Sequence, residues 1–129
     1  MILDTSALVA ILWAEPEEEA FVRCIAAADV VRISAATRLE LHLVLQGRLQ
    51  PDALAGVARF LARTGALIEP VTEAQAGLAM AAFDRFGRGR HPAALNYGDC
   101  FAYALAQSMG EPLLFKGDDF ARTDVRPAL

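Results

Sequence analysis

Acidic side chains stand at four places in this 129-residue chain where they could support chemistry. Asp4 follows the apolar run at the start of the chain, and Glu40 lies early in a helical pattern. Asp99 lies in the first turn of a later helical pattern, and Asp118 and Asp119 follow the last apolar run. Carboxylates only a few ångströms apart repel one another unless they are protonated or bridged by a cation. Oxygen ligands of this kind favour Mg²⁺, or Mn²⁺, over zinc or copper.

Whether these acids can meet depends on the elements that carry them. Four apolar runs are predicted to be strands, at residues 1–3, 29–34, 66–71 and 112–115. Helices are predicted from the spacing of apolar residues between these strands, at residues 7–13, 15–27, 35–45, 51–63, 73–86 and 96–109. Strands that alternate with helices predict an α/β fold with a central parallel sheet. The length predicts one domain, residues 1–129.

A parallel sheet gives most of these acids a common location. Ligands collect where the carboxyl ends of parallel strands meet helix N-termini. Asp4, Glu40 and the Asp118–Asp119 pair each follow a predicted strand, so they are expected at one edge of the sheet. Asp99 follows a loop, and the pattern alone does not place it there. If all of them meet, their clustering implies a metal ion.

Each acid also has a purely structural interpretation. Asp4 can cap the helix that follows it. Thr37 with Glu40 has the spacing of a capping box, and Asn96 with Asp99 is a close relative of one. The two aspartates after the last strand can form a turn beside a glycine. Taken singly, each acid is open to both interpretations, whereas their joint placement favours chemistry.

Composition narrows the class of protein. The chain is 55% hydrophobic, contains no apolar run of about 20 residues that could span a bilayer, and has a net charge of -4. We expect a soluble, cytoplasmic protein with no membrane segment. The charge argues mildly against nonspecific nucleic-acid binding. Cys24 and Cys100 stand singly without a metal-binding or redox spacing, so both are expected to be buried free thiols.

Four segments in this order resemble the PIN-domain family, and specifically its VapC-type toxin ribonucleases. They are ILDTS at 2–6, ISAATRLE at 33–40, NYGDC at 96–100 and LFKGDDF at 114–120. The resemblance covers the whole chain. It implies a PIN-like α/β/α sandwich, with helices on both sides of the sheet, and a Mg²⁺-dependent endoribonuclease. It also implies a VapB-type antitoxin that neutralises the enzyme, and a homodimer.

The resemblance also implies roles for individual residues. Asp4, Glu40 and Asp99 match the family's acidic triad, and Ser6 matches a hydroxyl that supports the site. We assign Asp4 and Asp99 to direct coordination of the ion, and Glu40 to a second ion or to orienting water. Thr5 is a weaker candidate than Ser6 for holding a carboxylate. Asp119 is favoured as the fourth acid, Asp118 stays open, and the number of ions is not fixed.

An acidic ribonuclease must still attract RNA. Arginines gather in the segment 85–91, immediately before the helix that carries Asp99. Arg88 and Arg90 are therefore candidate contacts to the phosphate backbone. The alternative is a solvated loop without a binding role.

Two other functions remain as alternatives. One is a PIN-like interaction module whose activity has lapsed, although the complete set of acids argues against it. The other is a receiver-type phosphoacceptor domain, in which Lys116 would be the lysine after the last strand. That alternative also requires an aspartate at the end of the third strand, where this chain has Val71, Thr72 and Glu73.

Overall fold

The computed structural model describes residues 1–47 and 51–129, and side chains throughout these ranges except at 51–54. A four-stranded parallel sheet has the order β3-β2-β1-β4. Its strands are β1 (Ile2–Leu3), β2 (Arg32–Ser34), β3 (Leu67–Glu69) and β4 (Leu113–Leu114). The helices are α1 (Thr5–Leu12), α2 (Glu18–Ala26), α3 (Ala35–Gly47), α4 (Pro51–Thr64), α5 (Glu73–Phe86) and α6 (Tyr97–Met109), followed by the 3₁₀ turn η1 (Phe120–Arg122).

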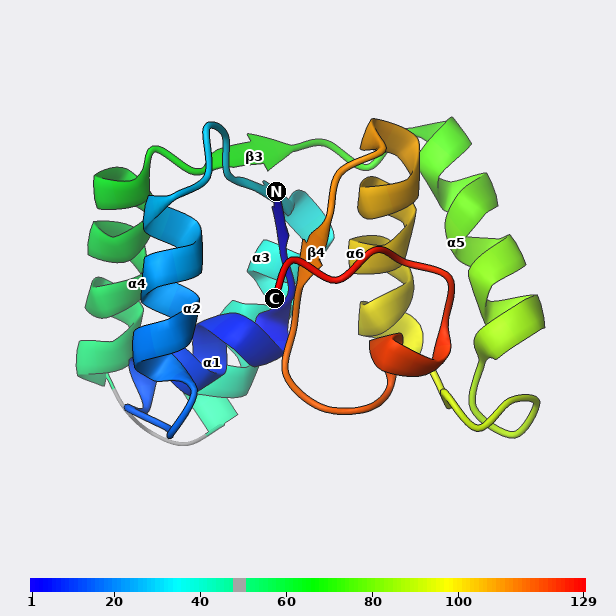
Figure 1. Cartoon of the computed structure of the whole chain (residues 1–129), viewed down its shortest axis with the longest axis horizontal. Coiled ribbons are helices and arrows are strands. Elements are labelled where there is room, and N and C mark those ends of the chain that lie inside the picture. Colours follow the sequence, from blue (N-terminus) through cyan, green and yellow to red (C-terminus); the bar gives the residue numbers. More distant parts are fainter. Residues whose placement is uncertain (48–50) are drawn as a thin grey trace.

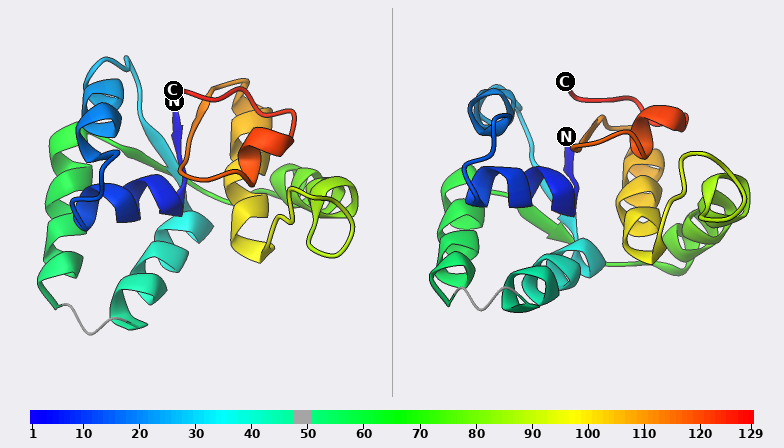
Figure 2. Two further views of the ribbon diagram at one scale, coloured as in Figure 1. Left: turned by 60° about the horizontal axis from the view of Figure 1, so that its bottom comes forward. Right: turned by 90° about the horizontal axis from the view of Figure 1, so that it is seen from below.

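Helices cover the sheet from two sides. In Figure 1, α1, α2 and α4 lie to one side of β1 and β4, and α5 and α6 lie to the other. Helix α3 contacts α1 and α4 as well as α6, and Figure 2 shows it between the two groups when the molecule is viewed from below. The predicted α/β/α sandwich with a central parallel sheet is therefore confirmed.

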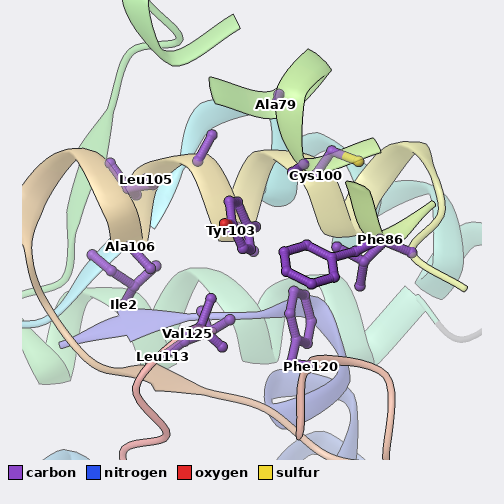
Figure 3. Close-up of a cluster of buried hydrophobic side chains, with 14 of the residues drawn as sticks. Ile2, Ala79, Phe86, Cys100, Tyr103, Leu105, Ala106, Leu113, Phe120 and Val125 are labelled. Carbon is purple, nitrogen blue, oxygen red and sulfur yellow. The ribbon is translucent and has the colours of Figure 1, made fainter. Parts of the chain in front are cut away.

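Two apolar clusters hold the layers together, one on each face of the sheet. Successive side chains of a strand point to opposite faces. Accordingly, Ile2 and Leu113 join the cluster under α5 and α6, whereas Leu3 and Leu114 join the cluster under α1 to α4. Figure 3 shows the first of these clusters, in which Phe86, Phe120 and Tyr103 lie beside the strands. Each two-residue strand is thus fixed by burial on both of its faces.

The ends of the elements follow from local chemistry. Gly110 ends α6 in the left-handed conformation, with φ of 63°, which glycine adopts without steric cost. Pro70 follows β3, which lies at the edge of the sheet, where the missing backbone N–H is tolerated. The capping box that the spacing of Thr37 and Glu40 allows does not form. The helix begins three residues earlier than such a box requires, at Ala35, and Ser34 Oγ accepts a hydrogen bond from Ala36 N (3.2 Å).

The helices in the described ranges are short. The longest, α4 and α5, have 14 residues each. At about 1.5 Å per residue, each rises about 21 Å, short of the roughly 30 Å hydrocarbon core of a bilayer. No helix in the described ranges is long and apolar enough to cross a membrane.

Candidate active site

The order of the strands creates a switch point beside β1. From β1 the chain moves outward to β2 and β3, and it then returns to place β4 on the opposite side of β1. The carboxyl ends of β1 and β4 therefore flank a topological switch point, where ligands of open α/β sheets bind. In Figure 1 the end of β1, the start of α6 and the turn after β4 all lie at the lower end of the molecule.

Asp4 follows β1 directly, at this switch point. The residue is 3% exposed. Oδ2 accepts hydrogen bonds from Ser6 N (2.8 Å) and Ser6 Oγ (2.6 Å), so Asp4 does cap α1. Oδ1 is buried and has no hydrogen-bond partner among the described residues. Burial raises the pKa of Asp4, and the nearby charge of Glu40 adds to the rise, while the hydrogen bonds from Ser6 oppose it.

Ser6 joins the two strand ends that flank the switch point. Its hydroxyl donates to Asp4 Oδ2 and accepts a hydrogen bond from the backbone N–H of Lys116 (2.9 Å), just beyond β4. One side chain therefore fixes both the orientation of the Asp4 carboxylate and the position of the turn after β4.

Replacing Ser6 by Ala should lower RNA cleavage about tenfold, because the Asp4 carboxylate loses a donor that orients it. Ser6→Thr keeps the hydroxyl and should retain most of the activity. Ser108→Ala is a matched control, since the Ser108 hydroxyl bonds only to Leu105 O among the described residues, near the other end of α6. Steady-state rates at fixed Mg²⁺ measure the difference, and equal rates for Ser6→Ala and Ser108→Ala would contradict the role of Ser6.

Glu40 has its own hydroxyl partner. Thr5 Oγ1 donates to Glu40 Oε2 (2.5 Å), which ties α3 to the start of α1. The sequence favoured Ser6 over Thr5 as the residue that holds a carboxylate. In the structure both do so, Ser6 for Asp4 and Thr5 for Glu40.

Asp99, which the sequence could not place, lies near the other acids. Burial raises its pKa to about 7, and the charges of Asp4, Glu40 and Asp119 contribute to the rise. Its predicted cap with Asn96 is also present, since Asp99 Oδ2 accepts from Asn96 N (2.7 Å) and Asn96 Oδ1 accepts from Asp99 N (3.0 Å). The cap occupies one carboxylate oxygen, so capping and metal binding do not exclude each other.

The two aspartates after β4 differ in their surroundings. Asp119 precedes η1, and its charge is one of those that raise the pKa of Asp99. The side chain of Asp118 is 84% exposed and lies 3.8 Å from Arg122 in an ion pair. These surroundings favour Asp119 over Asp118 as the fourth acid.

The arginines before α6 differ in whether their side chains already have partners within the chain. Arg85 pairs with Asp124 (2.5 Å) and lies over the ring of Phe86. Arg90 lies 3.7 Å from Asp84. In the described part of the chain, no hydrogen bond or ion pair engages the exposed side chain of Arg88.

Lys116 forms ion pairs with residues other than Asp4. Its Nζ pairs with Glu15 (2.7 Å) and Glu17 (2.8 Å), in the turn before α2. A receiver-type domain would use this lysine at the phosphoacceptor aspartate. The ion pairs therefore argue against the receiver-type alternative, and they link the turn after β4 to the start of α2.

The donor set fits a hard divalent cation. Its atoms are carboxylate and hydroxyl oxygens, the class that Mg²⁺ and Mn²⁺ prefer. The buried Asp4 Oδ1 is a lone acceptor that a cation would satisfy. Within the described ranges, no three acidic, histidine or cysteine side chains already converge on one point as metal ligands do. An ion shared by Asp4, Glu40 and Asp99 would therefore have to draw their carboxylates closer together.

Known proteins are similar to this chain in sequence and in length. Residues 1–126 match the family model described as PIN domain. Ribonuclease VapC28 of Mycobacterium tuberculosis is 48% identical over 130 residues, which covers 100% of this chain and 98% of that protein. Ribonuclease VapC of Mycolicibacterium smegmatis is 45% identical over 125 residues, with 97% of each chain covered.

Two solved structures share the fold. VapC20 of Mycobacterium tuberculosis, described as a sarcin-ricin loop cleaving toxin, matches with a TM-score of 0.75 at 21% identity over 98% of both chains. A chain of a toxin-antitoxin complex from Klebsiella pneumoniae matches with a TM-score of 0.69 at 19% identity, over 95% of this chain and 92% of that one. From the sequence matches, and in agreement with its fold, this chain belongs to the PIN-domain family and, within it, to the VapC ribonucleases.

Proposed function

We propose that this chain is a Mg²⁺-dependent endoribonuclease that hydrolyses RNA phosphodiester bonds in the cytoplasm as the toxin of a VapBC-type pair. Residues 1–129 would act as one domain. The observation that carries the proposal is the buried, unpartnered Asp4 Oδ1, which lies at the switch point of the sheet with Glu40 and Asp99 nearby. The names of the relatives, which are ribonucleases, support the same activity.

The proposed mechanism divides the work among these side chains. Asp4 and Asp99 would hold the ion, Glu40 would hold a second ion or orient the attacking water, and Asp119 would complete the acidic set. Ser6 and Thr5 keep the carboxylates of Asp4 and Glu40 in place. When bound, Mg²⁺ would neutralise charge on the phosphate oxygens and orient water, and Mn²⁺ could replace it.

The protonation of Asp99 sets a condition on this site. A carboxyl group with a pKa of about 7 is half protonated at neutral pH. A proton and a cation therefore compete for Asp99, and the cation displaces the proton when it binds. We expect the Mg²⁺ concentration needed for half-maximal cleavage to fall as the pH rises through 7.

The direct test incubates purified protein with total RNA in Mg²⁺, in Mn²⁺ and in EDTA, with Asp4→Asn as a matched control. Cleavage that requires a cation and Asp4 supports the proposal. Expression without an antitoxin should also stop bacterial growth. Absence of cleavage under every condition, together with normal growth during soluble expression, would favour the lapsed interaction module.

A VapB-type antitoxin and a second copy of the chain are the proposed protein partners. Helix α3 exposes Leu39 and Leu43, which are 59% and 60% accessible and stand one turn apart on one helix face. We propose that this face forms the homodimer contact. Light scattering should find a dimer for the wild type and a monomer for the variant in which both leucines are replaced by Asp. A wild-type monomer at tens of micromolar would contradict this proposal.

Arg88 and Arg90 are proposed to bind RNA without taking part in the chemistry. Replacing both by Ala should raise KM, leave kcat nearly intact and reduce the slope of log KM against log salt by about 0.7 per lost phosphate contact. The larger share should come from Arg88, because Arg90 already pairs with Asp84. Arg23→Ala, which removes an exposed α2 arginine paired with Glu19, controls for net charge. A loss confined to kcat would count against the proposed role.

A further inference from the structure

Gly98, the second residue of α6, lies directly against the carboxylate of Glu40. A Cβ atom added at Gly98 would lie within 2.7 Å of Oε1, Cδ and Oε2 of Glu40, closer than real Cβ contacts allow. The carboxylate therefore occupies the space in which any side chain at position 98 would begin. Close approach to backbone is a recognised use of glycine.

Backbone conformation does not explain this glycine. Gly98 lies in the first turn of a regular helix and has no positive φ, in contrast to Gly110 at the end of the same helix. In a helix, alanine is favoured over glycine. The lack of space is also specific to position 98, because a Cβ at Gly77 in α5 would meet nothing within 4 Å.

Thr5 also contacts the Glu40 carboxylate, since its hydroxyl donates to Oε2. Thr5 is the residue after Asp4, and Gly98 is the residue before Asp99. The Glu40 carboxylate thus contacts both segments that carry the other acids. A shift of either segment would move this carboxylate.

We propose that Gly98 is a positioning residue, whose missing side chain lets the Glu40 carboxylate contact the segments that carry Asp4 and Asp99. The expected effect of Gly98 on cleavage rests on the function proposed above. The close contact between Gly98 and Glu40 does not depend on that function, because both residues belong to the chain itself.

A thermal-melt cycle in EDTA tests the steric basis without using activity. Gly98→Ala should fail to raise the Tm, or lower it, because the new methyl group meets Glu40. In the Glu40→Ala background the same change should raise the Tm, since the obstruction is gone and only the helix preference remains. Gly77→Ala should raise the Tm in both backgrounds and serves as the matched control.

Cleavage kinetics test the consequence for the site. Gly98→Ala should lower kcat about tenfold or more and raise the Mg²⁺ concentration for half-maximal rate, with little change in KM for RNA. Glu40→Asp shortens the side chain by one methylene, which withdraws the carboxylate from position 98. Adding Gly98→Ala to Glu40→Asp should therefore cost no more than about twofold, far less than in the wild type.

Several results would overturn the proposal. One is a Gly98→Ala effect on the Tm that is the same with and without Glu40. Another is wild-type cleavage and Mg²⁺ dependence for Gly98→Ala. If Gly98→Ala does not fold, the Gly98→Ala/Glu40→Ala protein should, and failure of both to fold would also reject a contact with Glu40. If the wild type cleaves no RNA, the proposed function fails, while the melt cycle still decides the role of Gly98.

Discussion

Substituting Asp99 by Asn should reduce RNA cleavage about 1000-fold or more without unfolding the protein. Asn keeps an oxygen that can accept the hydrogen bond from Asn96 N, so the N-terminal cap of α6 survives. It loses the negative charge that a cation needs, and several kcal/mol of transition-state stabilisation depend on that cation. Initial rates over a range of Mg²⁺ concentrations measure the loss.

The same substitution should change stability in a pH-dependent way in EDTA. The folded pKa of Asp99 is raised to about 7 from 3.8. Below pH 4 both folded and unfolded states hold the proton, so wild type and Asp99→Asn should differ little. Between pH 4 and 7 the unfolded wild type loses its proton first, which lowers wild-type stability. Above pH 7 the variant should be more stable by about 1 to 2 kcal/mol, after allowance for partial exposure.

Added Mg²⁺ separates the two roles of Asp99. The cation should raise the Tm of the wild type by mass action and that of Asp99→Asn much less. If Asp99→Asn cleaves RNA at the wild-type rate and shows the same Mg²⁺-dependent shift in Tm, Asp99 is a helix cap alone and its assignment as a ligand is wrong.

The adjacent aspartates after β4 should respond very differently to the same substitution. Asp119→Asn should lower cleavage about 100-fold, because the charge of Asp119 reaches Asp99 and belongs to the proposed acidic set. Asp118→Asn should leave cleavage within about twofold of wild type, since this exposed side chain loses only a surface ion pair with Arg122.

This pair of variants is internally matched, because the two residues are neighbours with the same side chain. Their kcat values, measured at saturating Mg²⁺, decide between them. A larger loss for Asp118→Asn would transfer the fourth acidic position to Asp118. Losses of equal size in both would suggest that the turn after β4 matters as a whole.

Most of the fold could be predicted from the sequence because its signals are local. The apolar runs predict all four strands, and Asn96 and Gly110 mark the two ends of α6. Pro70 indicates either an edge strand or the end of a strand, because a missing N–H is tolerated there. Both hold, since β3 ends at Glu69 and lies at the edge of the sheet. Parallel pairing of strands separated by helices then gives the layers.

Contacts between distant segments could not be predicted in the same way. The position of Asp99 near Asp4 depends on where α6 begins, and a loop leaves that open. The pairing of Thr5 with Glu40 depends on which face of α3 turns toward α1. The sequence contains one indication of the role of Gly98, namely a glycine at a helical position. That the Glu40 carboxylate lies against it could be identified only from the structure.

The place of β1 in the sheet has a consequence for the synthesis of the protein. β1 and Asp4 are made before β4, yet β1 pairs with β4, so that Leu3 stands opposite Leu114. The Ser6 hydroxyl likewise accepts a hydrogen bond from the backbone N–H of Lys116, just after β4. The nascent chain therefore carries Asp4 without Lys116 and the proposed acids Asp99 and Asp119 until these later segments have been translated. The proposed site can be completed only after β4 and the turn that follows it have been made.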